Sequence, residues 1–395
     1  MLSLLLFLSF VPVSAAIRAG SGCSKEGITS VFASTTYRCI KSGKKLVWAK
    51  DASGATPVPL IPTEQIAIRI ENMLHTSTGI SGVYLKQIDG AVISEIRSDY
   101  LFEPASSIKV LVALYIFSAA VRGEIKLSDS FPTIKSLDPE ECPKPITNST
   151  ESFESATREM MQFSDNGRTD ALVMFFGPQK INDYAKSIGL PNTQIQTTSS
   201  FPGFNLIGCV ASKNINDNPI TVDGNTSNLQ ELGKVWELAN ALPDPFRAQF
   251  MRLTAGREMF ETTGKDFTGI WPSLINIVKQ EAPSGMSPNM ISNFISQMRS
   301  NSKGGSYSRC FKTPNCTTVR SWRSMVSLSS IPYCLSKNSA SSRSFVWGYF
   351  SAGVDSNSAE KNSKNISWAT FSKLDAEPVR EQIRIALLNW SACGT

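Results

Sequence analysis

The residues from Phe102 to Gly123, FEPASSIKVLVALYIFSAAVRG, contain an apolar run with almost no polar face. Pro104 stands just ahead of this run, as proline does at helix starts, and Gly123 stands where a helix needs a left-handed stop. The pattern predicts a helix, and a helix that is apolar all round is buried in a core. Its first turn carries two polar residues, Ser106 and Lys109, whose spacing places them on one helical face.

The segment ahead of this buried helix is predicted to form a helix and a hairpin. Thr63 can cap a helix that runs to about His75. The strand-like runs SGVYLKQI and AVISEIRS follow, and Asp89-Gly90 between them is a strong signal for a hairpin turn.

The rest of the chain divides into a helical block and a group of strands. Helical periodicity fills most of residues 150–300, in segments at 151–163, 168–176, 178–188, 227–241 and 286–299. After Lys303 the pattern returns to strands in WRSMVSLSSIPY and SFVWGYFSAGV, and an amphipathic helix spans about 375–390. We therefore predict an α+β fold, an α/β sandwich. Its antiparallel sheet comes from both chain ends, is flanked by helices, and is interrupted by an all-helical insertion.

The amino-terminal residues predict export. Residues 1–16, MLSLLLFLSFVPVSAA, join an apolar run to a small-residue cleavage pattern, which is typical of a secretory signal peptide. The run is shorter than a bilayer requires, and no later segment is long and apolar enough, so we expect no stable membrane span. The expected location is secreted, periplasmic or associated with the cell wall.

Three further segments complete the predicted domain organisation. Residues 17–50 are rich in Gly, Ser and Thr and contain Cys23 and Cys39, which predicts a small module stapled by a disulfide. Residues 51–61 have the composition of a linker, and residues 62–395 form the main domain.

The chain has eight cysteines, and in an exported protein these are disulfide candidates before they are metal ligands. Cys23 and Cys39 are expected to pair because they lie in one small segment. Cys310 is close in sequence to both Cys316 and Cys334, and this choice stays open.

Charge and histidine content exclude several functions. The net charge of +6 is modest for 395 residues, and aromatic and basic residues are not interleaved, so we expect no nucleic-acid partner. The one histidine, His75, ends a predicted helix, where a cation is favourable without any catalytic role. Zinc hydrolases normally need more than one histidine, so we expect no metal and no other cofactor.

With histidine and metal catalysis excluded, Lys109 is the remaining candidate for a catalytic base. An ammonium in an apolar interior costs several kcal/mol unless it is paired or loses its proton. Sharing a proton with Ser106 would make a serine nucleophile with a lysine base. The tetrad Ser-x-x-Lys also begins at Ser42, Ser300 and Ser358, so the competing interpretation is a helix-start serine beside a snorkelling lysine.

Two later motifs favour the catalytic interpretation. Ser164-Asp165-Asn166 lies between predicted helices, and Lys303-Gly304-Gly305 precedes the returning strands. With Ser106-x-x-Lys109 they follow the order of the S-x-x-K, S-D-N and K-T-G motifs of class A β-lactamases and penicillin-binding proteins. Residues 61–395 thus resemble the serine β-lactamase and penicillin-binding-protein superfamily, with class A closest.

The resemblance implies a role for each motif residue. Ser106 would be the nucleophile, Lys109 the base or proton relay, and Ser164 the proton donor to the leaving nitrogen. Asn166 would hold Lys109 and the substrate amide, and Lys303 would attract a substrate carboxylate.

The resemblance also places substrate contacts on the third motif. Lys303, Gly304 and Gly305 would bind substrate, and the backbone N–H groups of Ser106 and Ser306 would form the oxyanion hole. Gly304 departs from the family pattern, because a threonine or serine hydroxyl is missing there.

A second departure concerns hydrolysis of the acyl-enzyme. Class A enzymes use a loop glutamate after the S-D-N motif, but no Asp or Glu occurs from Tyr184 to Asn216. The nearest acids are Asp183, Asp217 and Asp223. Acylation is therefore expected, whereas efficient turnover is not.

The expected function is an exported serine hydrolase that forms an acyl-enzyme on Ser106 with β-lactams or related amide or peptidoglycan-peptide substrates. One alternative is a true β-lactamase with an unusual deacylation residue. Another is a non-catalytic wall-binding protein on the same scaffold. We expect a monomer.

Overall fold

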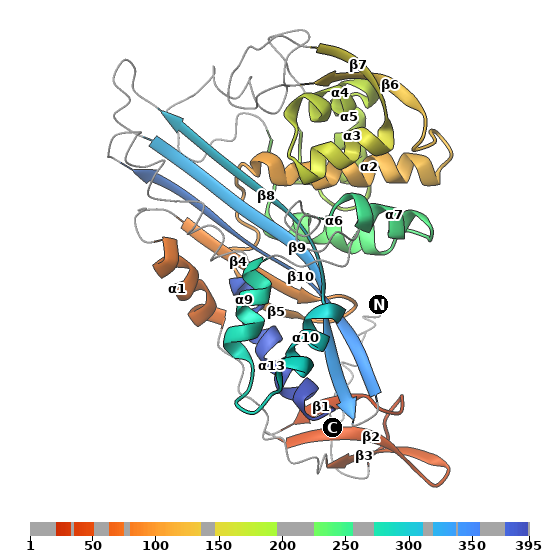
Figure 1. Ribbon diagram of the computed structural model, residues 1–395, viewed down its shortest axis with the longest axis vertical. Helices are drawn as coiled ribbons and strands as arrows, with labels where there is room; N and C mark the ends of the chain where they lie inside the picture. Colours follow the sequence, from red (N-terminus) through yellow and green to blue (C-terminus); the bar gives the residue numbers. More distant parts are fainter. Residues whose placement is uncertain are drawn as a thin grey trace, which may run out of the picture. The chain divides into compact units, whose positions relative to one another are not determined.

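The computed structural model describes residues 21–32, 35–50, 63–74, 80–135, 147–195, 225–255, 272–310, 319–336, 339–355 and 376–393 (Figure 1). Contacts within the chain divide it into two compact units, Met1–Leu60 and Ile61–Thr395.

The described strands of the first unit form one antiparallel sheet in the order β1-β2-β3. These strands span Thr29–Phe32, Thr35–Ser42 and Lys45–Lys50. The predicted disulfide between Cys23 and Cys39 is confirmed, with 5.9 Å between the two Cα atoms. Cys39 lies opposite Trp48 in the sheet, and both side chains are buried. A core this small depends on such a covalent link.

The described strands of the second unit form the predicted antiparallel sheet from both ends of the domain. Its order is β5-β4-β10-β9-β8, and every neighbouring pair is antiparallel (Figure 1). The strands are β4 (Ile80–Gln87), β5 (Val92–Ile96), β8 (Arg299–Cys310), β9 (Val319–Ser336) and β10 (Ser339–Asp355).

One strand boundary was predicted wrongly. Lys303-Gly304-Gly305 lies inside β8, which begins at Arg299, and not ahead of the returning strands. The stretch consists of polar residues and glycines, and its polar side chains at Ser300, Asn301, Ser302 and Lys303 are nevertheless buried. Such a stretch lacks the apolar alternation by which strands are recognised.

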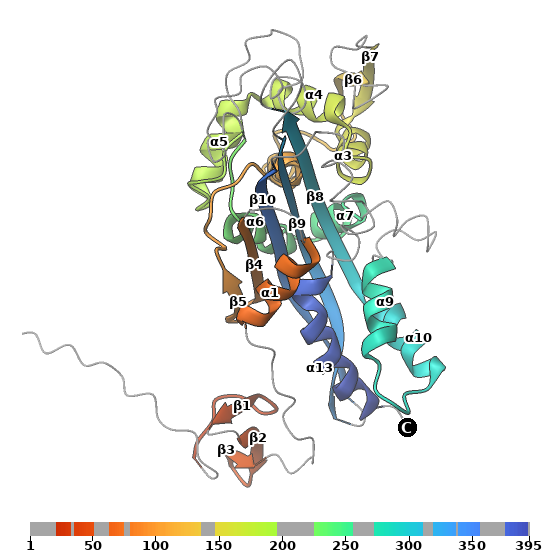
Figure 2. The same ribbon diagram turned by 90° about the vertical axis from the view of Figure 1, so that its left-hand side faces the viewer.

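Both faces of this sheet are covered by helices, as the sandwich prediction requires. On β10, Val346 and Phe350 pack into a large cluster with α2 and α6, while Phe345 and Trp347 point to the opposite face. This alternation follows from the two-residue period of a strand. The opposite face is covered by α1 (Thr63–Leu74), α9 (Pro272–Glu281), α10 (Pro288–Gln297) and α13 (Arg380–Ser391) (Figure 2).

Four helices of the insertion match predicted segments: α3 (Phe153–Gln162), α4 (Asn166–Phe176), α5 (Pro178–Ser187) and α6 (Leu229–Asn240). Two helices, α7 (Phe246–Leu253) and α9, were not predicted from the sequence. The structure adds a two-stranded pairing of β6 (Ser130–Lys135) with β7 (Thr147–Ser152), which the sequence pattern did not indicate.

The apolar helix is buried as predicted. It is α2 (Lys109–Val121), with a 3₁₀ turn, η1 (Ala105–Ile108), directly ahead of it. Gly123 has a φ of +73° and ends the helix in the left-handed conformation that glycine adopts without strain. Ser106 therefore lies in a tighter turn than an α-helix, while Lys109 is the first residue of α2.

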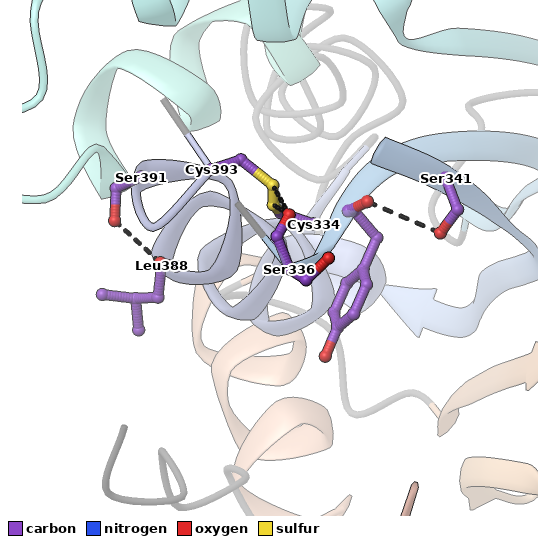
Figure 3. The surroundings of a disulfide bond; sticks show 7 residues. Cys334, Ser336, Ser341, Leu388, Ser391 and Cys393 are labelled. Carbon is purple, nitrogen blue, oxygen red and sulfur yellow. Dashed lines mark hydrogen bonds between the residues drawn. A yellow bond between two sulfur atoms is a disulfide. The ribbon is translucent and has the colours of Figure 1, made fainter. Parts of the chain in front are cut away.

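A second disulfide excludes one of the two partners left open for Cys310. Cys334 on β9 pairs with Cys393, just past the end of α13, and is therefore not the partner of Cys310 (Figure 3). The two paired residues are 59 positions apart in sequence, and only the packing of α13 against β9 brings them together.

Some predictions fall outside the described residues. These are the signal peptide at 1–16, the linker at 51–61, the partner Cys316, His75, and the two acids Asp217 and Asp223. In the part of the chain that the structure describes, no helix is both long and apolar enough to span a bilayer.

Candidate active site

The turn that carries Ser106 is fixed to strand β9 of the sheet by hydrogen bonds. The buried Ser107 hydroxyl donates to the Pro104 carbonyl at 2.7 Å and lies 2.8 Å from the Ser324 hydroxyl on β9. Ala105 has a φ of +47°, which is uncommon for a residue with a side chain and persists only where surrounding contacts enforce it. Ser106 itself is only half-buried, whereas its neighbours Ala105 and Ser107 are buried.

Lys109 is fully buried, at 0% exposure, and its amine reaches across to the second motif. The Nζ atom lies 2.6 Å from the Ser164 carbonyl oxygen, 2.6 Å from Asn166 Oδ1 and 3.1 Å from the Ser164 hydroxyl. Ser164 and Asn166, which follow Lys109 by 55 and 57 positions in the sequence, thus both contact its amine.

Burial changes the protonation of this amine. It lowers the pKa of Lys109 from 10.5 to about 7, while the negative charges of Asp170 and Asp165 act in the opposite direction. A neutral amine has two N–H groups and one lone pair. It can donate to the Ser164 carbonyl and the Asn166 amide oxygen, which leaves its lone pair to accept a hydrogen bond from the Ser164 hydroxyl. The surroundings therefore suit a base at neutral pH.

The loop that presents Ser164 is held in an unusual conformation. Ser164 has a φ of +57°. The next residue, Asp165, caps α4 by accepting a hydrogen bond from the Arg168 backbone N–H at 2.7 Å. The Arg168 guanidinium also bridges Asp165 and Glu151 at 2.8 and 2.9 Å. Capping and ion pairs together fix the backbone that points the Ser164 carbonyl at Lys109.

Strand β8 forms the other side of the site. The buried Lys303 amine donates to the Met161 carbonyl at 3.1 Å, next to the loop of Ser164. A Cβ atom at Gly305 would lie 2.1 Å from the Pro104 carbonyl oxygen and 2.8 Å from the Ser106 backbone nitrogen. Real Cβ atoms do not come so close, so only glycine permits this contact between strand and turn.

The structure thus brings the three motifs together. Ser106, Lys109 and the Ser164 loop share one region, and Lys303 and Gly305 border it. Gly304 and Ser306 flank Gly305 on the same strand, with Ser306 opposite Arg323 on β9. Among the described residues, no hydrogen bond joins the Ser106 hydroxyl to the Lys109 amine, which is engaged with the Ser164 loop.

The family of the chain follows from a comparison with family models. The model described as the beta-lactamase enzyme family matches residues 65–297, which is more than half of the chain. The chain belongs to this family. The matched segment includes Ser106, Lys109 and Ser164-Asp165-Asn166, and it ends just ahead of Lys303.

Solved structures show that the β-lactamase-family fold extends over most of the chain. A beta lactamase from Xanthomonas campestris pv. campestris is 15% identical, with a TM-score of 0.50 over 81% of this chain and 97% of that one. A representative class A beta-lactamase from Bacteroides cellulosilyticus is 16% identical, with a TM-score of 0.50 over 84% and 99%. At these identities the likeness concerns the fold alone. No curated protein matches the chain.

One buried acidic residue near the site, Asp170, was not identified from the sequence. Asp170 is 1% exposed and lies on α4 one helical turn after Asn166, whose amide oxygen contacts Lys109. Spacing of i and i+4 on a helix places two side chains on one face, and this spacing was the available signal. Of the acids weighed from sequence, Asp183 lies on α5, exposed and bonded to Gln179 at 2.8 Å.

Proposed function

We propose that this member of the β-lactamase family is an exported serine acyl-transfer enzyme. It forms an ester on Ser106 with β-lactams or related amide and peptide substrates. The observation that carries the proposal is the buried Lys109 amine, whose pKa is lowered to about 7 by burial and which lies 3.1 Å from the Ser164 hydroxyl. An amine that titrates near neutral pH can replace imidazole as the base.

The proposed acylation step moves one proton and exchanges two bonds. Neutral Lys109 takes the Ser106 hydroxyl proton, and the serine oxygen attacks the substrate carbonyl. Backbone N–H groups of Ser106 and Ser306 hold the oxyanion, a contribution usually worth a few kcal/mol. When the C–N bond breaks, the Ser164 hydroxyl passes a proton to the leaving nitrogen and recovers one from Lys109.

Substrate binding is assigned to the residues around this centre. Asn166 holds the Lys109 amine and offers its amide N–H group to the substrate. Lys303, with Gly304 and Gly305, supplies positive potential along β8 for a substrate carboxylate. Without a loop carboxylate between Tyr184 and Asn216, the ester forms faster than water removes it.

Labelling with a fluorescent penicillin, followed by peptide mapping, tests the proposal. The label is expected on Ser106 and lost in Ser106→Ala. Ser300→Ala is the matched control, because Ser300 also begins a Ser-x-x-Lys tetrad but its buried hydroxyl pairs with that of Ser329. A folded protein without an adduct on Ser106 contradicts the proposal and favours a non-catalytic binding role.

A chromogenic cephalosporin such as nitrocefin separates acylation from turnover. A burst of one equivalent without steady hydrolysis is the expected result. Sustained hydrolysis instead identifies a true β-lactamase. Peptides that end in D-Ala-D-Ala, tested in competition with the fluorescent penicillin, then report whether peptidoglycan stems occupy the same serine.

A further inference from the structure

The net charge of the chain is confined to its first fifty residues. Residues 21–50 contain six lysines and arginines and one acid, Glu26, and Arg18 precedes them. Residues 51–395 contain 32 basic and 32 acidic residues, so the β-lactamase-family unit is neutral as a whole. An excess of positive charge in one small segment does not help that segment to fold, because like charges repel one another in a compact state. The excess therefore suggests a role in binding.

Three of the six basic residues at 21–50 surround one turn. Lys41 is the last residue but one of β2, Lys44 lies in the turn, and Lys45 begins β3, and all three are exposed. Gly43 makes the turn possible with a φ of +62°. The three lysines thus lie within a span of five residues, and this span contains no carboxylate that could neutralise their charge.

The module presents this turn from a rigid base. The Cys23–Cys39 disulfide joins the segment before β1 to β2. The backbone N–H of Cys23 donates to the Leu46 carbonyl at 3.2 Å, and that of Trp48 donates to the Ser21 carbonyl at 2.8 Å. The charges are therefore held together by structure and not merely by composition, which lowers the entropy cost of binding.

We propose that this lysine turn, Lys41 to Lys45, binds an anionic glycan, a polymer with repeated phosphate or carboxylate groups. Lysines act as compact point charges without the bidentate geometry of arginine, which suits a flexible repeating polyanion. The proposal is independent of Ser106 chemistry. Its consequence is that the neutral acyl-transfer unit is concentrated on an acidic polymer in the compartment predicted by the signal sequence.

Other polyanions fit the module less well. A membrane-inserting hairpin needs large apolar side chains at its tip, whereas this tip reads Ser42-Gly43-Lys44, and the exposed Ile40 lies back on β2. A single-stranded nucleic acid needs several exposed aromatic rings for stacking, but among the described side chains of the module Trp48 is only 8% exposed and Tyr37 is half-buried.

The full-length protein provides the test. Binding to polyglycerol phosphate and to polygalacturonate is measured over a range of salt concentrations, for the wild type and for Lys41→Gln, Lys44→Gln, Lys45→Gln together. The control removes three exposed lysines of the other unit in the same way, Lys126, Lys180 and Lys186. Phosphatidylglycerol vesicles, duplex DNA and neutral dextran are compared at equal charge or mass.

The turn variant is expected to bind the anionic glycans about tenfold or more weakly at low salt. Its slope of log affinity against log salt concentration is expected to fall by about 2 to 3. The control variant should bind like the wild type. Equal weakening in both variants, no weakening in the turn variant, or tighter binding to vesicles or DNA than to either glycan overturns the proposal. Labelling of Ser106 by penicillin should be unchanged in every variant.

Discussion

The two sides of the candidate site are held by different kinds of interaction. On the helical side, Lys109 meets Ser164 and Asn166 through hydrogen bonds to a buried amine. On the strand side, Gly305 meets Pro104 and Ser106 through backbone packing that leaves no room for a side chain. The helical side therefore depends on protonation, while the strand side depends on shape. Substitutions on the helical side should therefore alter the pH dependence of acylation, and substitutions on the strand side should not.

The largest effect is expected from Lys109→Met. This change keeps much of the volume of the buried side chain but removes the base, so acylation by penicillin should slow by about 10² to 10⁴-fold. Stopped-flow measurement of acyl-enzyme formation reports the rate. The exposed Lys126→Met is the control and should acylate normally. Unimpaired acylation in Lys109→Met would remove the amine from the mechanism.

Gly305→Ala tests the strand side. The added Cβ would meet the Pro104 carbonyl oxygen at 2.1 Å, so β8 must move away from the turn of Ser106. A displacement of this kind should cost about a hundredfold in acylation and about 1–3 kcal/mol in unfolding free energy. The pH midpoint of the remaining activity should not move. Gly22→Ala is the control, since a Cβ at Gly22 would meet no other atom within 4 Å.

Asp170→Asn tests the electrostatics of the helical side. Acylation should rise with pH as Lys109 loses its proton, with a midpoint near its pKa of about 7. Asp170 raises that pKa, so its removal should move the midpoint to lower pH. Below the midpoint, each whole pH unit of movement increases the neutral fraction of the amine tenfold.

The pH profile of acylation, measured for wild type and Asp170→Asn, gives both midpoints. Asp183→Asn serves as the control because this carboxylate is exposed on α5. A midpoint that stays fixed or rises in folded Asp170→Asn would show that another group controls Lys109.

The smallest effect is expected from Ser324→Ala. Its hydroxyl lies 2.8 Å from that of Ser107 and donates to the Pro104 carbonyl at 3.2 Å. Ser107 retains its own bond to Pro104, so the loss should be about 1 kcal/mol of unfolding free energy, with acylation slowed less than tenfold. Ser300→Ala removes a similar buried serine pair from β8 and β9, at 2.8 Å from Ser329, and should destabilise without slowing acylation.

The fold was largely predictable because its elements follow local patterns. The hairpin at Asp89-Gly90, the buried helix after Ser106 and the final helix all depend on residues within a few positions of one another. Strand β8 was placed too late because its site-bordering residues are polar and small. A strand whose residues border a binding site lacks the alternation of apolar and polar residues by which strands are recognised in a sequence.

The candidate site was predictable only in part. The spacing of Ser106 and Lys109, the charge of the first fifty residues and the nearness of Cys23 to Cys39 are properties of the sequence by itself, because each is local. The meeting of Lys109 with Ser164, the burial of Asp170 beside it and the pairing of Cys334 with Cys393 were decided by the tertiary structure. These contacts join distant positions, and only the path of the packed chain determines which distant positions meet.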